Sequence, residues 1–333
     1  MKKYFAIPLA FLILLTFACS PPPQTLTNPS PRFEDTQLDG LKRLEGSILK
    51  ITCSAYYENY YYSDPAMANE SPSQQSLFIN KKFTTNSVAG TGLIVLQYAD
   101  KILMLSCHHV FSFEDTIRTY YLNEKNQLSK YLQSLSIRYG QTIYVTHRDG
   151  TNSLGKIIVF DEANDIALIE TEASAHQLSE FPFQGLFDKT TDIKLGQEIY
   201  LLGFPKGMFL VTRGLATPSK YKNKFITDVS FNRGFSGGIA IAFNYPAADF
   251  HYIGMATSTA YDSEFVIAPS ESFQNIQTYR NVPFKEDVYL KDLKMINYGI
   301  TFVTKSEVIL DFFKKESESI KQMGYHNIST IIK

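Results

Sequence analysis

Three separated segments of the chain carry the side chains that covalent hydrolysis needs. Ser236 lies among the glycines of segment 234–238, His109 follows a strand-like run, and Asp165 precedes the apolar run 166–169. A serine hydroxyl is a weak nucleophile at neutral pH. It needs a base to take its proton, an acid to orient that base, and N–H donors for the oxyanion. The order His, Asp, Ser supplies these parts and predicts hydrolysis through an acyl-enzyme.

The residues around these three side chains follow known motifs. Segment 106–110 is similar to Thr-Ala-Ala-His-Val, with Cys107 and His108 as departures, and 165–168 reads Asp-Ile-Ala-Leu. Segment 234–238 is similar to Gly-Asn-Ser-Gly-Gly, with Phe235 in place of Asn. In these motifs the chain resembles trypsin-like serine peptidases, and among them the bacterial HtrA/Deg branch. Further matches follow in the expected order at 89–95, 148–158, 202–205 and 297–302, so the likeness spans about residues 44–320.

The resemblance implies an all-β fold of two six-stranded antiparallel β-barrels with a C-terminal helix, and an active site in the cleft between the barrels. It implies His109 as general base, Asp165 as its orienting acid and Ser236 as nucleophile. The amides of Gly234 and Ser236 would form the oxyanion hole. The substrate would be a protein or peptide, and no cofactor would be needed.

Two residues of these motifs require a choice. Adjacent residues on a strand face opposite ways, so only one of His108 and His109 can face Ser236. The resemblance selects His109 and leaves His108 a structural role. Phe235 could stack on the substrate, or it could hold the loop 234–238, here called the oxyanion loop, in an inactive form. A latent enzyme therefore stays open, as does an inactive lipoprotein that binds protein ligands.

An esterase is a further alternative, because segment 234–238 also satisfies Gly-x-Ser-x-Gly, the nucleophile elbow of α/β-hydrolases. That fold needs a helix directly after the serine, whereas residues 239–243 form a short apolar run typical of a strand. It also needs a histidine downstream, where only His251 and His326 occur. The sequence favours the peptidase.

The resemblance also assigns a substrate pocket. Ser230, six residues before the nucleophile, would lie at its base, and Met255, Ala256 and Thr257 would form its wall. Because no acidic residue occupies the base, we expect small or medium aliphatic side chains rather than Lys or Arg at the cleaved position.

The N-terminus predicts export and lipidation. Lys2 and Lys3 precede the apolar run 4–18, which is typical of a secretory signal. Cys19 ends a lipobox-like segment and would carry the lipid, with an ordinary cleaved signal or an uncleaved anchor as the alternatives. Residues 19–40 read as a Pro-rich tether. We therefore expect a bacterial envelope protein, anchored to a membrane on the periplasmic or surface side.

Composition sets the remaining limits. The 333 residues carry a formal net charge of −1, so no nucleic-acid partner is expected. We expect a peptidase domain over 41–325, with the first barrel at about 44–180, the second at about 190–304 and the helix at about 305–323. Too few residues remain after it for a PDZ domain.

Local patterns predict several elements. Short runs rich in Val, Ile, Tyr and Phe predict strands, and leucines at helical spacing predict a helix over 124–139. Segments 54–86 and 262–293 read as irregular insertions, the first of them rich in tyrosine. Thr304 with Glu307 predicts a capping box for the C-terminal helix, and Gly324 predicts its end.

Two cysteines, Cys53 and Cys107, remain after Cys19. Outside the cytoplasm they could form a disulfide, or they could be two buried free thiols, and the sequence leaves both possibilities open. A metal site is not expected, because no Cys/His pair has ligand spacing.

Overall fold

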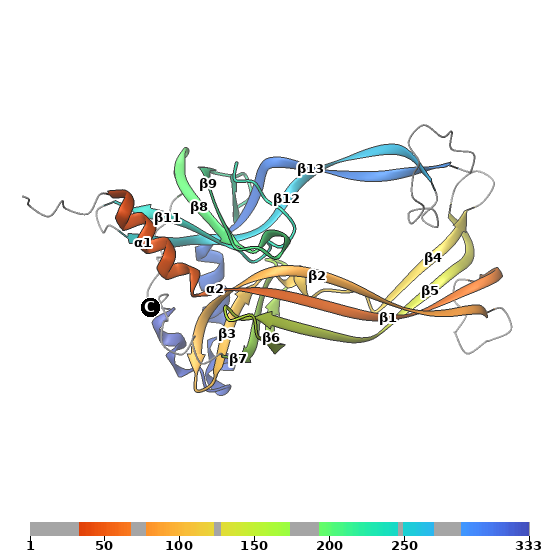
Figure 1. Ribbon diagram of the computed structural model, residues 1–333, viewed down its shortest axis with the longest axis horizontal. Coiled ribbons are helices and arrows are strands. Elements are labelled where there is room, and N and C mark those ends of the chain that lie inside the picture. The colour runs from red at the N-terminus through yellow and green to blue at the C-terminus, as the bar shows by residue number, and fades with distance from the viewer. Residues whose placement is uncertain are drawn as a thin grey trace, which may run out of the picture.

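A computed structural model describes residues 33–67, 78–122, 128–173, 193–245, 249–269 and 288–332 (Figure 1). The predicted signal peptide and the lipidation site at Cys19 lie outside these ranges. A helix, α1 (Phe33–Glu45), covers the last residues of the predicted tether. Within the described ranges, no helix has both the length and the apolar character to cross a bilayer.

The first barrel is closed by the pairing of β1 with β5. Its order is β1-β2-β3-β7-β6-β5, and β4 pairs with the outer side of β5. All pairings are antiparallel. Its strands are β1 (Ile48–Met67), β2 (Phe78–Tyr98), β3 (Lys101–Ser106), β4 (Thr116–Leu122), β5 (Leu128–Thr146), β6 (Asn152–Asp161) and β7 (Ile166–Glu172).

The second barrel closes in the order β10-β13-β12-β11-β8-β9. Two closed six-stranded antiparallel barrels therefore confirm the predicted fold class. The strands of this barrel are β8 (Gln197–Gly203), β9 (Leu210–Thr217), β10 (Lys224–Thr227), β11 (Ile239–Asn244), β12 (Asp249–Pro269) and β13 (Val288–Lys305).

A shared apolar core joins the barrels. Leu168 of β7, Leu202 of β8 and Phe313 of the C-terminal helix belong to one buried cluster. A second cluster fills the second barrel alone and includes Phe225 and Phe235. Strands such as β3 and β11 are buried along nearly their whole length, since one face packs inside the barrel and the other against its neighbour. The two barrels therefore pack directly against each other through this cluster.

Two segments predicted as irregular insertions are β-structure instead in the parts that the structure describes. β1 and β2 stay paired out to Tyr62 and Phe78, and β12 and β13 stay paired out to Pro269 and Val288. Figure 1 shows the outer parts of these strands, with β4 and β5, extending away from the barrels. Where the structure describes these segments, at 54–67, 78–86, 262–269 and 288–293, the predictions of irregular insertions were wrong, because cross-strand pairing, which local composition does not reveal, makes them strands.

The predicted helix over 124–139 was also wrong, since residues 128–146 form strand β5. Leu132 and Leu135 suggested a helical face, and both are indeed buried, in a small cluster with Tyr62. The pairing of β5 with β1 shifts register between Tyr61 and Ala66. Such an irregularity breaks the alternation of the strand, which explains the misleading spacing.

The C-terminal helix is present as α2 (Ser306–Gln322), which buries Ile309 and Phe313 against the shared core. The predicted capping box does not form. Thr304 still belongs to β13, where it pairs with Lys224, and Lys305 takes the cap position without a side-chain capping bond. Gly324 adopts a φ of +100° after the helix, and this confirms the predicted stop.

Candidate active site

Segment 106–110 places the imidazole of one of its two histidines next to Ser236. After β3 the chain enters a 3-10 turn, η3 (His108–Val110). His109 Nε2 lies 2.8 Å from Ser236 Oγ, whereas the His108 ring stacks on Phe160 with its centroid 4.5 Å away. The predicted choice of His109 agrees with this geometry. The reason differs, because both residues lie in a 3-10 turn, where the alternation of a strand does not apply.

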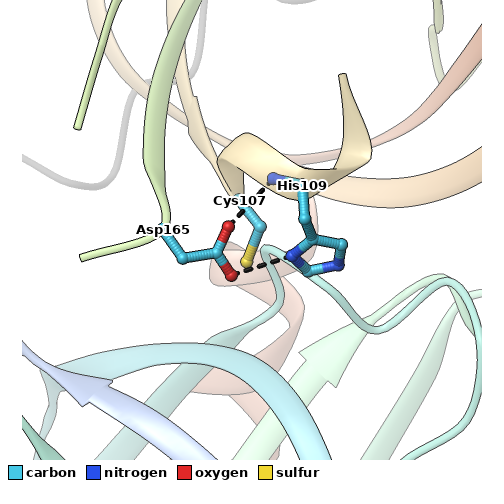
Figure 2. Close-up of side chains that lie close together, drawn as sticks. All are labelled: Cys107, His109 and Asp165. Carbon is cyan, nitrogen blue, oxygen red and sulfur yellow. Dashed lines mark hydrogen bonds and ion pairs between the residues drawn. The ribbon is translucent and has the colours of Figure 1, made fainter. Parts of the chain in front are cut away.

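Asp165 holds His109 at two points. Its carboxylate accepts the His109 backbone N–H at 2.9 Å and lies 2.8 Å from the ring atom Nδ1 (Figure 2). A hydrogen on Nδ1 leaves Nε2 free to accept the serine proton. Asp165 has a φ of +59°, a left-handed conformation that Asp and Asn tolerate better than other non-glycine residues. This turn aims the carboxylate at the imidazole.

The loop around Ser236 needs its glycines. Gly234 and Gly237 have φ values of +104° and +86°, and a Cβ on Gly237 would lie 2.0 Å from the Thr91 carbonyl oxygen. Among the described residues, neither the backbone N–H of Gly234 nor that of Ser236 donates a hydrogen bond to another backbone group. Both donors are therefore available to the oxyanion for which the sequence proposed them.

Thr91 ties this loop to the first barrel, a role that the sequence reasoning missed. Its N–H donates to the Ser236 carbonyl at 2.7 Å, and its hydroxyl donates to the Gly234 carbonyl at 2.7 Å. The same hydroxyl accepts the N–H of Phe204 at 2.9 Å. Thr91 is fully buried, so these bonds are shielded from water. The only available signal was its place between two glycines in the segment 89–95.

Phe235 faces the protein interior. Its side chain is fully buried in the core of the second barrel, with its ring centroid 6.1 Å from that of Phe231. The expectation that it could stack on the substrate is therefore wrong. The buried ring of Phe235 therefore anchors the oxyanion loop to the core of the second barrel. The Gly-Asn-Ser-Gly-Gly motif has the polar residue Asn at this position.

The residues assigned to the substrate pocket differ in their burial. Met255 and Ala256 are fully buried and belong to the two cores, while Ser230 is exposed. The backbone of their strand does lie beside the nucleophile, since Ala256 accepts the Gly237 N–H at 2.9 Å. Thr257 Oγ1 lies 3.4 Å from Lys224 Nζ. Lys224 is a charged neighbour of this wall that sequence reasoning did not identify.

Both remaining cysteines are buried free thiols, so the disulfide alternative is wrong. Cys53 Sγ accepts Gln141 Nε2 at 3.1 Å, whereas Cys107 Sγ donates to the Ala256 carbonyl at 3.4 Å. Burial raises the pKa of Cys53 to about 11. Burial, and then the charge of Asp165, raise the pKa of Cys107 well above its usual value.

One of three comparisons with known proteins includes the residues of this site. Residues 90–244, which include His109, Asp165 and Ser236, match the family model of the trypsin-like peptidase domain, and this match supports a serine protease. Among solved structures, the chain is similar to the serine endoprotease from Yersinia pestis, with a TM-score of 0.44 and 15% identity. That similarity covers 84% of this chain and 65% of the other. No curated protein matches the sequence.

Proposed function

We propose that this protein is a serine endopeptidase of the HtrA/Deg type that cleaves proteins of the bacterial envelope through Ser236, His109 and Asp165. One observation carries the proposal. Asp165, His109 and Ser236 form a continuous hydrogen-bonded chain, with both contacts of the imidazole at 2.8 Å. The match to a trypsin-like peptidase domain over 90–244 supports the same chemistry.

In the first half of the reaction, Ser236 Oγ attacks the peptide carbonyl carbon while His109 Nε2 takes the hydroxyl proton. Asp165 keeps the Nδ1 hydrogen in place and stabilises the imidazolium that forms. The N–H groups of Gly234 and Ser236 bind the oxyanion of the tetrahedral intermediate. As the C–N bond breaks, the imidazolium gives its proton to the leaving amine, and the acyl chain stays on Ser236.

In the second half, a water molecule replaces the amine. His109 Nε2 takes one of its protons as the water oxygen attacks the acyl carbon. When the second tetrahedral intermediate collapses, the proton returns to Ser236 Oγ and the new carboxylic acid leaves. The same base therefore serves both halves.

A reactive-serine probe tests the assembled site. The full-length chain is incubated with a fluorophosphonate, alongside Ser236→Ala, His109→Ala and the neighbouring control His108→Ala. We expect labelling of the parent and of His108→Ala, and none of the other two. A folded parent that takes no label would contradict the proposal and would instead favour a protein that binds ligands without cleaving them.

The charges near the residues assigned to the pocket support a proposal about cleavage specificity. Ser230 supplies no negative charge, and Lys224 places a positive one beside Thr257. We therefore propose small or medium aliphatic residues at the cleaved position. A peptide library cleaved mainly after Arg or Lys would contradict this.

The anchor is a separate part of the proposal. Lys2, Lys3 and the apolar run before Cys19 support lipidation and attachment to a membrane. Metabolic labelling with an alkyne fatty acid tests it, with Cys19→Ser as the control. Equal incorporation by both forms would remove Cys19 as the modified residue.

A further inference from the structure

A thiol that the proposed mechanism does not use lies behind the acid–base pair. Cys107 Sγ, a ring nitrogen of His109 and a carboxylate oxygen of Asp165 lie within 4.8 Å of one another, and Nδ1 is the ring nitrogen that contacts Asp165. Figure 2 shows the sulfur beside the Asp165 carboxylate, which in turn contacts the imidazole. Sequence spacing did not indicate this cluster, because Asp165 follows His109 by 56 positions.

These donors match one class of cation. Sulfur at about 2.3 Å, imidazole nitrogen at about 2.0 Å and carboxylate oxygen at about 2.0–2.2 Å are the ligands of tetrahedral Zn²⁺. Such distances place the donor atoms roughly 3.3–3.6 Å apart. The three donor atoms already lie within 4.8 Å of one another, and the 2.8 Å contact between His109 Nδ1 and Asp165 would widen to the zinc-ligand spacing on binding. A thiolate selects Zn²⁺ or Cd²⁺ over Mg²⁺ or Ca²⁺, which prefer oxygen ligands.

We propose that Cys107, His109 and Asp165 form an inhibitory site for a soft divalent cation of the zinc class. The inhibitory part rests on the proposed peptidase function, whereas the binding part does not. The motif that segment 106–110 resembles has alanine at the position of Cys107, and alanine has no donor atom to offer. The site is therefore a property of this chain's own sequence.

Binding redistributes two protons and needs no other reactant. The Cys107 thiol releases its proton to solvent as the sulfur–metal bond forms, because a coordinating thiol is deprotonated. His109 Nδ1 coordinates through its lone pair, and its hydrogen moves to Nε2. The net change is one cation bound and one proton released.

This tautomer explains the inhibition. With a hydrogen on Nε2, His109 becomes a donor toward Ser236 Oγ and can no longer take its proton. Asp165, engaged by the cation, also stops orienting the ring for catalysis. The His109 side chain is 44% exposed and that of Asp165 is 21% exposed, so a small ion reaches the cluster from the imidazole side. The cation therefore prevents activation of the Ser236 hydroxyl without occupying the substrate cleft.

Cadmium titration tests binding directly. The full-length chain carries Cys19→Ser throughout, so that Cys53 and Cys107 are its two thiols. Cd²⁺ is added while the sulfur-to-cadmium charge-transfer absorbance is recorded in the ultraviolet. We expect one equivalent to produce the band in this parent and in the control Cys53→Ala, and no band in Cys107→Ala or Cys107→Ser.

The second readout is the rate of fluorophosphonate labelling, with each variant normalised to its own cation-free rate. We expect Cd²⁺ and Zn²⁺ to abolish labelling of the parent and of Cys53→Ala, and a chelator to restore it. Half-inhibition of Cys107→Ser should need at least about tenfold more cation, because the soft ligand is lost.

Two results would overturn the site: no charge-transfer band in the parent, or equal inhibition of the parent and both Cys107 variants. A parent that binds Cd²⁺ through Cys107 but takes no label without metal would retain the site. That result would contradict the peptidase function instead, so the two failures are distinguishable.

Discussion

The two halves of the candidate active site are positioned in different ways. His109 and Asp165 both come from the first barrel, from turns next to the paired strands β3 and β7. Ser106 of β3 lies opposite Ala167 of β7, so the ends of these strands bring the two turns together. The candidate acid–base pair is therefore assembled within one barrel.

The Ser236 loop belongs to the second barrel and reaches the first through Thr91. Its shape comes from glycines with positive φ. Its position depends on hydrogen bonds to Thr91 of the first barrel and on the burial of Phe235 in the core of the second barrel. This difference implies that His109 and Asp165 can be correctly placed in the first barrel while Ser236, on a loop of the second barrel, is displaced. Variants of the two halves should therefore fail in different ways.

The largest effect is expected from Asp165→Asn. The amide can still occupy the left-handed turn, but it no longer favours the His109 tautomer that accepts the serine proton. We expect kcat for peptide hydrolysis to fall by about 10⁴ with little change in melting temperature. Asp161→Asn is the matched control, since Asp161 accepts hydrogen bonds from Asn164 in the same loop and should keep its rate. Equal losses would show that Asp165 only shapes the loop.

Phe235→Ala should come next. Removing this fully buried ring leaves a cavity that costs about 3–5 kcal/mol of stability, and it frees the loop that carries the oxyanion donors. We expect the labelling rate of the folded protein to fall by about 10²-fold, the cost of a displaced donor. Phe225→Ala, in the same core, should lose similar stability by chemical denaturation but keep its labelling rate. Equal labelling rates in Phe235→Ala and Phe225→Ala would show that Phe235 does not anchor the oxyanion loop.

Thr91→Val removes a hydroxyl while keeping the shape of the side chain. It leaves the Gly234 carbonyl and the Phe204 N–H without this partner, at a cost of about 1–3 kcal/mol. We expect about a tenfold loss in kcat, with rescue by Thr91→Ser. Thr171→Val is the control, because its buried hydroxyl donates to the Leu154 carbonyl within the first barrel. If both variants lose only stability, Thr91 does not position the nucleophile.

The smallest effect is expected on the pH dependence of stability, through Cys53 in the first barrel, away from the candidate active site. Burial raises the pKa of Cys53 from 9.0 to about 11, so the folded state disfavours the thiolate. The unfolded chain loses this proton first, and stability should therefore fall as the pH rises from about 9 through 11. Melting temperatures across this range should decline less for Cys53→Ala than for the parent. Parallel curves would contradict the raised pKa.

Sequence reasoning succeeded where chemistry or composition leaves local traces. The strand-rich runs and the resemblance predicted both barrels, and apolar spacing predicted α2. It failed at residues 128–146, where leucines at helical spacing lie on a strand with an irregular register. It also failed at Thr304, whose hydroxyl has no hydrogen-bond partner among the described residues because the residue still belongs to β13.

The sequence by itself determined the side chains of the candidate acid–base pair and of the candidate nucleophile, their order, and the glycines that the serine loop requires, because each needs a particular residue type. Only the tertiary structure decided that Thr91 braces this loop, that Phe235 points into the core, and that Cys107 lies behind Asp165. These three depend on contacts between the barrels or between distant strands. Such contacts arise from packing over the whole chain, and no local pattern encodes them.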